Sequence, residues 1–238
     1  MSMGNADEFL DLYKRLEGEA IDRYGFPKDG TAVSRLERLP EFRDIAQELS
    51  YCRDVRNLLQ HRYQLDGGFA VQPSDGMVAL LRRTLDKIEH PLACRDVATG
   101  IDRVFGRRPG DRVLPAMRVM RERGFTYLPV FQDAGRERLY GVFGENAIFS
   151  YLIDDNPNIG DDCTFSAMQG YLRLDAQPPF RFAFLSCDAP LREAGALIDQ
   201  AFAHGKRVGM IFLTRGGRAD DPLEGIMTPY DILVRGRR

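Results

Sequence analysis

The sequence of 238 residues predicts a helical N-terminal part followed by a mixed α/β part that contains an internal repeat. Apolar residues recur at helical spacing over the first ninety or so positions, whereas short β-like and helical runs alternate afterwards. The second part also matches itself at an offset of 78 to 84 residues. We therefore expect an α/β plus α protein with domains at residues 1–91, 92–160 and 161–238.

Composition and charge place the chain among ordinary globular proteins. Hydrophobic residues make up 44% of it, and 33 Lys and Arg against 35 Asp and Glu give a net charge of -2. This balance shows no general attraction to nucleic acid or membranes, and no apolar run reaches the roughly 18 residues that span a bilayer. The four cysteines are scattered without a C-x-x-C pair, which is typical of buried thiols in a reducing compartment. A cytoplasmic protein without a metal site is expected.

Three helices in an antiparallel arrangement are expected in the first part. The first has an apolar stripe over 9–21 and ends near Gly25, where glycine is the preferred residue beyond a helix end. The second runs over 40–63 and begins with Pro40, which suits the first helical turn. The third begins after a Ser74 or Asp75 cap and ends at His90.

The second part consists of short alternating elements. The expected strands are 103–105, 127–131, 139–143, 182–185, 208–213 and 223–227. The expected helices are 113–123, 146–152, 164–172, 191–204 and 229–234. In the alignment of this part with itself, Gly124 falls on Gly205, and the run from Gly141 falls on the run from Gly225. This pattern predicts two β-α-β-β-α units related by pseudo-twofold symmetry.

The repeated unit resembles the CBS motif. The match is best over 223–233, Leu-Glu-Gly-Ile-Met-Thr-Pro-Tyr-Asp-Ile-Leu, and Leu-Pro-Val-Phe at 128–131 resembles the corresponding strand of the first copy. Two such units, over about residues 94–238, resemble a CBS pair, or Bateman module. The resemblance implies a regulatory module that binds an adenine nucleotide (AMP, ADP or ATP) and has no catalytic cofactor.

The second copy carries the candidate nucleotide-binding residues. Thr228 begins the last helix, where its hydroxyl can cap backbone N–H groups or face a phosphate. Asp231 lies one turn further on the same face and can accept both hydroxyls of a ribose. Lys206 and Arg207 precede the central strand and would meet phosphate charge. The alternative is that Thr228 and Asp231 only cap the helix, while both cations are solvated.

The resemblance also implies which residues surround the base. By position, apolar strand residues and backbone would sandwich the adenine, and a glycine would allow close backbone approach. These residues are Phe184, Leu185, Val208, Met210 and Gly225.

The first copy departs from the pattern. Gly144 stands in place of the threonine and Ala147 in place of the ribose-binding aspartate, and neither side chain can hydrogen-bond a sugar. Glu145 would repel a phosphate. We expect one competent and one degenerate cleft. Arg107 and Arg108 either hold a phosphate at the degenerate cleft or form a solvated basic loop.

The run Arg-Asn-Leu-Leu-Gln-His-Arg-Tyr over 56–63 resembles the HEPN motif. HEPN domains are often metal-independent ribonucleases, so the resemblance implies His61 as acid or base and Arg56 at the scissile phosphate. Asn57 shares a helical face with His61 and can orient it. Tyr63 matches a tyrosine that is AMPylated in some HEPN toxins. The alternative is that the dipole favours His61 at the helix end and that Arg56 pairs with a nearby acid: Asp54, Glu48 or Asp66.

Three functions follow in order of preference. The first is a regulatory protein whose CBS pair binds the nucleotide and controls a helical homodimer. The second is a HEPN-type ribonuclease with an RNA substrate, gated by that nucleotide. The third is a dimerisation scaffold without catalysis.

Overall fold

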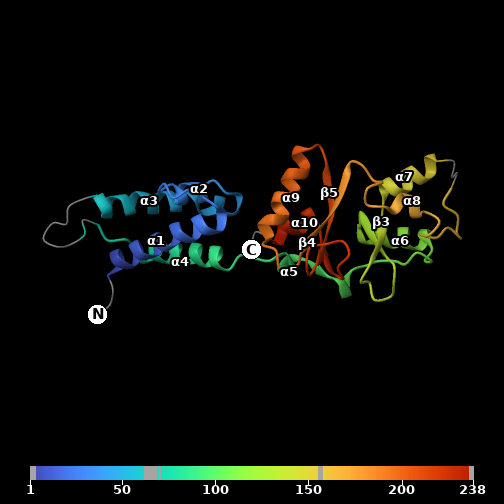
Figure 1. Cartoon of the computed structure of the whole chain (residues 1–238), viewed down its shortest axis with the longest axis horizontal. Helices are drawn as coiled ribbons and strands as arrows, with labels where there is room; N and C mark the ends of the chain where they lie inside the picture. The colour runs from blue at the N-terminus through green and yellow to red at the C-terminus, as the bar shows by residue number, and fades with distance from the viewer. Residues whose placement is uncertain (1–3, 62–68, 70, 155–157, 236–238) are drawn as a thin grey trace. The chain divides into compact units, whose positions relative to one another are not determined.

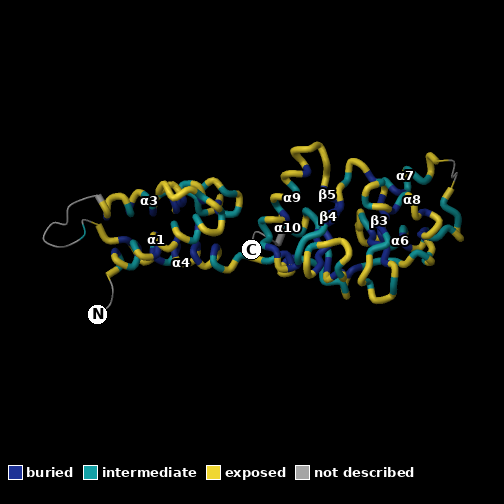
Figure 2. Tube along the Cα trace, in the orientation of Figure 1, coloured by how far each residue is buried: buried dark blue, intermediate teal, exposed yellow. Residues whose placement is uncertain are grey.

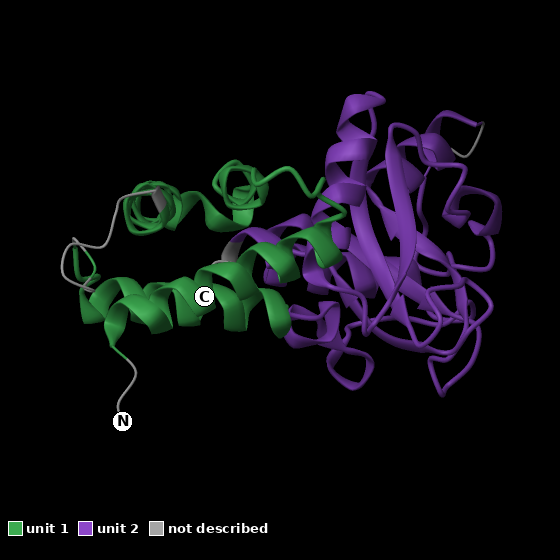
Figure 3. Ribbon diagram, turned by 60° about the vertical axis from the view of Figure 1, so that its left-hand side comes forward, with its two compact units in different colours: residues 1–91 green, residues 92–238 purple. Residues whose placement is uncertain are grey.

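The computed structural model describes residues 4–61, 69, 71–154 and 158–235 (Figure 1). Buried residues recur along the helices and strands in both parts of the chain (Figure 2). The chain divides into two units, Met1–Pro91 and Leu92–Arg238 (Figure 3). Among the described residues, no helix is both long enough and apolar enough to cross a bilayer.

Unit 1 is helical, as its apolar stripes predict. Its helices are α1 (Asn5–Tyr24), α2 (Ala32–Leu36), η1 (Pro40–Ile45), α3 (Ala46–His61) and α4 (Asp75–Glu89). Gly25 takes a left-handed conformation with φ 65° beyond α1, and the Ser74 hydroxyl accepts from Met77 N at 3.4 Å at the start of α4. The second expected helix is wrong in its first turn, which is the 3-10 helix η1, and the sequence pattern does not predict α2.

Side-chain contacts give the directions of these helices. Tyr24 at the end of α1 contacts Phe42 of η1, which leads directly into α3, and Tyr13 contacts Arg56 further along α3, so α1 runs antiparallel to η1 and α3. Asn5 donates to Asp75 at 2.7 Å, and further along the same pair of helices Arg15 pairs with Glu89 at 3.1 Å, so α1 and α4 run parallel. The long helices α1, α3 and α4 therefore alternate in direction, as an antiparallel helical domain requires, and α1 is parallel to α4 because the chain reverses direction twice between them.

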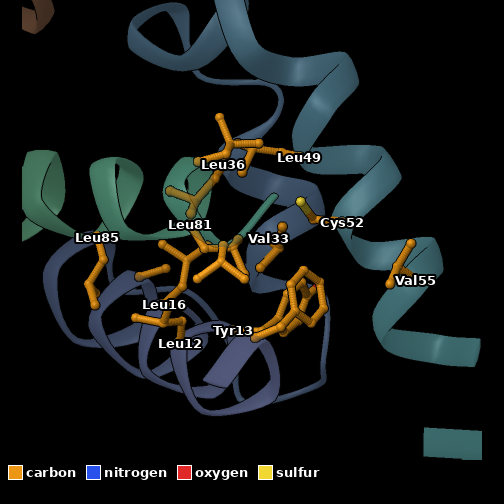
Figure 4. Close-up of a cluster of buried hydrophobic side chains, with 14 of the residues drawn as sticks. Leu12, Tyr13, Leu16, Val33, Leu36, Leu49, Cys52, Val55, Leu81 and Leu85 are labelled. Carbon is orange, nitrogen blue, oxygen red and sulfur yellow. The ribbon is translucent and has the colours of Figure 1, made fainter. Parts of the chain in front are cut away.

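The core of unit 1 joins the inward faces of all four α-helices. Phe9 and Leu16 of α1, Leu36 of α2 and Leu49 of α3 are fully buried, and Leu81 of α4 packs with them. Figure 4 shows part of this cluster, with side chains from α1, α2, α3 and α4 directed toward one another. Cys52 lies in the same core, and burial raises the pKa of its thiol to about 11.

The second half of unit 2 has the expected element order. It consists of β4 (Phe180–Ser186), α9 (Leu191–Ala203), β5 (Arg207–Thr214), β6 (Leu223–Met227) and α10 (Pro229–Arg235). β4 pairs with β5 in parallel and β5 pairs with β6 antiparallel. A short strand β1 (Thr99–Gly100), near the start of unit 2, completes the sheet order β1-β6-β5-β4.

The first half repeats this order in reduced form. It consists of α6 (Val113–Arg123), β2 (Tyr127–Phe131), β3 (Leu139–Gly144) and α7 (Glu145–Ile153), with β2 and β3 antiparallel. In place of a first strand there is a single parallel bridge between Arg107 and Val130. In each half, two segments joined through a helix pair in parallel, and the second of them then pairs with the next strand in antiparallel fashion.

Two sequence-based expectations for unit 2 are wrong. Residues 103–105 do not form a strand, because Arg136 Nη1 donates to the carbonyls of Ile101 and Val104 at 3.1 and 2.7 Å, and Ile101–Arg103 is the 3-10 helix η2. The expected helix over 164–172 is limited to α8 (Gln169–Leu172). The sequence pattern also does not predict the short helix α5 (Cys94–Val97).

A shared core joins the two halves. Phe131 and Val142 of the β2–β3 hairpin pack in one cluster with Phe182, Met210 and Phe212 of the other sheet. Gln177, which is 1% exposed, donates from Nε2 to Val142 O at 2.7 Å across the same boundary. The two halves therefore form one compact unit with a shared core and are not two independent domains.

Candidate nucleotide site

Thr228 and Asp231 form a reciprocal cap at the start of α10. Asp231 Oδ2 accepts from Thr228 N at 2.9 Å and from Thr228 Oγ1 at 2.8 Å, and Asp231 N donates to Thr228 O at 3.1 Å. Both residues are half-buried. The sequence predicts that these two side chains lie together, and the structure shows that they do cap the helix.

The cap occupies only one of the two carboxylate oxygens. Asp231 Oδ1 makes no hydrogen bond with any described residue, and a carboxylate has about four acceptor positions. The Oδ1 atom can therefore accept hydroxyl groups from a ligand while Oδ2 keeps the cap. Capping and sugar binding are compatible roles for this carboxylate.

Strand register places two cations at the same end of the sheet. Met227, the last residue of β6, pairs with Ile211 of the antiparallel strand β5. The four residues of β5 that precede Ile211, which are 207–210, therefore extend beyond the end of β6 where the chain turns into α10. Lys206 and Arg207 are exposed there, and neither makes an ion pair with a carboxylate in the described part of the chain. The positive charges of Lys206 and Arg207 therefore lie toward the same end of the sheet as the start of α10, and the charge of Arg207 also acts on Tyr127 of the first half.

The apolar residues expected around the base do not converge on one face. Phe184 and Met210 belong to the core that joins the halves, whereas Leu185 and Val208 belong to the cluster beneath α9 and α10. Phe184 and Leu185 are successive strand residues and point to opposite faces. Val208 and Met210 are two residues apart, and the register shift that leaves Gly209 out of the pairing with β4 places them on different faces. Phe184 also stacks on Phe212, with ring centroids 5.3 Å apart. All four side chains therefore have a core role in this structure.

Gly225 provides a close approach between two backbones. It pairs with Leu213 of β5 and Gly100 of β1, and an added Cβ would lie 2.8 Å from Thr99 O. The sequence predicts backbone approach at this glycine, and the neighbour in the structure is strand β1. Its role is to allow β1 to join the sheet.

The corresponding place in the first half offers no such acceptor. Ala147 is fully buried in the core of that half, and a Cβ at Gly144 would meet the Tyr127 ring at 2.8 Å. Glu145 is exposed.

Tyr127, at the start of β2, lies in an aromatic environment. Burial raises the pKa of Tyr127 to about 12, and its ring lies edge-on to Phe180 and Phe182, with centroids 5.4 Å from each. Sequence reasoning misses this tyrosine, because an aromatic residue at a strand start is typical of an ordinary core.

In unit 1, Arg56 is engaged by other residues of α1 and α3. Its Nη2 lies 3.7 Å from Glu17 Oε2, its guanidinium lies 5.6 Å from the centre of the Tyr13 ring, and its Nη1 donates to Asn57 Oδ1 at 3.2 Å. Burial raises the pKa of Glu17, and the charge of Arg56 partly opposes this shift. Among the described residues, the ion-pair partner of Arg56 is Glu17 on another helix and neither Asp54 nor Glu48; Asp66 lies outside the described residues.

The remaining HEPN-like residues give less information. Asn57 is exposed and accepts from Arg56. His61 is the last residue of α3, and Tyr63 lies outside the described residues. The structure thus brings together Arg56 and Asn57, and the grouping of all four remains a prediction.

Comparison with known proteins gives structural neighbours only. No family model matches the chain, and no curated protein matches it. An acetoin utilization protein (AcuB) from Vibrio cholerae has 15% identity and a TM-score of 0.46, over 62% of this chain and 91% of its own.

Two further neighbours are CBS proteins with bound nucleotides. CBSX2 in complex with AMP has 17% identity and a TM-score of 0.43, over 60% of this chain and 95% of its own. The CBS domain of a bacterial CNNM/CorC family Mg²⁺ transporter in complex with ATP has 14% identity and a TM-score of 0.41, over 65% and 92%. The chain is thus similar in structure to CBS proteins, and the names of these three neighbours do not include a HEPN domain.

Proposed function

We propose that this protein is a regulatory module of CBS type that binds an adenine nucleotide at the second half of unit 2. In this proposal Asp231 Oδ1 accepts the ribose hydroxyls, Thr228 supports that carboxylate, and Lys206 and Arg207 meet the phosphates. The observation that carries the proposal is the Asp231 carboxylate, of which one oxygen caps α10 and the other makes no hydrogen bond with a described residue. The two cations toward the same end of the sheet, without ion-pair partners among the described residues, support it.

The proposal includes a doubled architecture with unequal sites. Residues 92–160 and 161–238 are the two copies, related by pseudo-twofold symmetry, and only the second binds nucleotide. A buried Ala147 supports this asymmetry, since an alanine offers a sugar no polar atom.

The nucleotide controls the helical unit in this proposal, and unit 1 assembles as a homodimer. A ligand shifts such an equilibrium only by binding one arrangement more tightly. We assign no catalytic step to unit 1, because Arg56 already balances the charge of Glu17. This favours regulation over the ribonuclease alternative.

Thermal unfolding tests the nucleotide site. AMP, ADP or ATP at millimolar concentration should raise the melting temperature of the full chain, because a ligand that binds only the folded state stabilises it. The shift should be lost in Asp231→Ala and kept in Asp199→Ala, which removes an exposed acid from α9. Equal shifts in both variants would show that the nucleotide binds elsewhere.

A further inference from the structure

The first half of unit 2 contains a cavity that the proposed nucleotide site does not use. Its volume is about 280 Å³, and it lies between the loop before α6 and the turn of the β2–β3 hairpin. The lining residues are Gly106, Arg107, Arg108, Asp111, Phe131, Asp133, Ala134 and Arg136.

This cavity lies at the opposite end of the hairpin from the position that corresponds to Thr228. Gly144, the counterpart of Thr228, pairs with Tyr127 at the start of β2. The cavity instead borders Phe131, at the far end of β2, and the turn that follows it. Five residues of strand, each rising about 3.3 Å, separate the two ends. It is therefore a separate site.

The three arginines of the cavity make no ion pair with a carboxylate among the described residues. Arg107 lies over the Phe105 ring, 4.2 Å from its centre, and donates from Nη1 to Gly106 O at 3.0 Å. Arg136 uses its Nη1 on two backbone carbonyls and lies 5.9 Å from the centre of the Phe131 ring. Aromatic faces and carbonyls hold the guanidinium groups of Arg107 and Arg136 in place, and neither kind of contact neutralises their positive charge.

Each of the two carboxylates in the cavity accepts a backbone N–H through one of its oxygens. Asp111 Oδ2 accepts from Arg108 N at 2.9 Å, and Asp133 Oδ1 accepts from Glu137 N at 3.3 Å. Each acid thus fixes the turn that carries an arginine. The lining keeps an excess of one positive charge, from three arginines and two acids.

The backbone around the cavity is also fixed. Arg107 N donates to Pro129 O at 3.1 Å and Phe131 N donates to Arg107 O at 2.8 Å. Gly106 lies so close to the Phe131 ring that a side chain could not be added without a shift. Arg136 has a φ of 61°, a left-handed conformation that is uncommon for a residue other than glycine. A preorganised set of donors costs little to order on binding.

The geometry points to a binding site for a small phosphate-bearing ligand in this cavity. Guanidinium groups match phosphate oxygens with two parallel N–H donors, which makes arginine the preferred residue for this anion. The volume lies just below the range of about 300–1,000 Å³ typical of drug-sized ligands, so a diphosphate-sized group fits better than a large molecule. This inference does not depend on nucleotide binding at Asp231.

Calorimetric titration of the full chain with inorganic pyrophosphate tests this site. Arg108→Gln removes a charge whose side chain is exposed, and it should weaken pyrophosphate binding at least about tenfold. Arg118→Gln on α6 removes the same charge from outside the cavity and should leave affinity nearly unchanged. Both variants should keep the melting temperature of the unliganded protein. Binding should weaken as salt rises.

Three results would overturn the inference. The first is a wild-type chain that gives no heat of binding with millimolar pyrophosphate. The second is an equal loss of affinity in Arg108→Gln and Arg118→Gln, which would indicate unspecific attraction. The third is loss of pyrophosphate binding in a variant that carries both Lys206→Gln and Arg207→Gln, which would place the anion at the nucleotide site; unchanged affinity in that variant supports a separate site.

Discussion

Replacing Arg56 by alanine separates a structural role for this residue from a catalytic one. The change removes the ion pair with Glu17 and the contact with the Tyr13 ring. The side chains of Arg56 and Glu17 are 25% and 18% exposed, which places their pair between surface and buried pairs. Surface pairs contribute about 0–1 kcal/mol, and breaking a buried pair costs about 3–5 kcal/mol. With about 0.5–1 kcal/mol for the ring contact, we expect unfolding to become easier by about 2 kcal/mol.

Urea unfolding followed by far-ultraviolet circular dichroism measures this loss. The control is Arg15→Ala, which breaks a shorter ion pair with Glu89 at 3.1 Å in the same unit. Because the Arg15 side chain is 54% exposed, that change should cost no more than about 1 kcal/mol. A double-mutant cycle of Arg56→Ala with Glu17→Gln should give a coupling free energy of about 1 kcal/mol.

Equal stability losses in Arg56→Ala and Arg15→Ala, with no coupling to Glu17, would refute this reasoning. Arg56 would then be available to a substrate phosphate. The account also expects that any cleavage of RNA by the purified protein without metal is unchanged in Arg56→Ala. Loss of such cleavage in that variant would restore the ribonuclease alternative.

Other properties of the chain follow from the same contacts. Burial raises the pKa of Glu17 above its ordinary value, so the folded state binds this proton more tightly than the unfolded state. The free energy of unfolding should therefore fall as pH rises through the raised pKa. Glu17→Gln should flatten this part of the stability–pH curve measured by urea unfolding. Gly225→Ala should lower the free energy of unfolding by about 1–3 kcal/mol in the same assay, because the added methyl group clashes with Thr99 O. The control Gly195→Ala, in open space on α9, should raise it by about 0.5–1 kcal/mol. Equal effects of the two changes would refute the close approach. Without nucleotide, Asp231→Ala should lower the free energy of unfolding by about 1 kcal/mol through loss of the cap, and an unchanged value would contradict the cap geometry.

Much of the fold could be predicted because its signals are local. The apolar stripe and the glycine after α1, the serine cap of α4 and the strand runs of the second half each depend on a few neighbouring residues. The pairing of Thr228 with Asp231 was accessible for the same reason, since three residues separate them on one helix.

The missed features depend on contacts between distant segments. Arg136 donates to the carbonyls of Ile101 and Val104, 35 and 32 residues away, so a side chain occupies acceptors that a neighbouring strand would use where the sequence predicts a strand over 103–105. The acid that pairs with Arg56 lies on another helix, so spacing within α3 could not identify it. Local pattern carries no information about such long-range partners.

Calorimetric stoichiometry tests the central claim most directly. The full chain is titrated with AMP, ADP and ATP in turn, and the Asp231→Ala variant is titrated with whichever binds. The account predicts that the wild-type chain binds one nucleotide per chain, at Asp231, and that Asp231→Ala binds it at least about tenfold more weakly. Absence of binding by all three nucleotides, or unchanged affinity in Asp231→Ala, would contradict it.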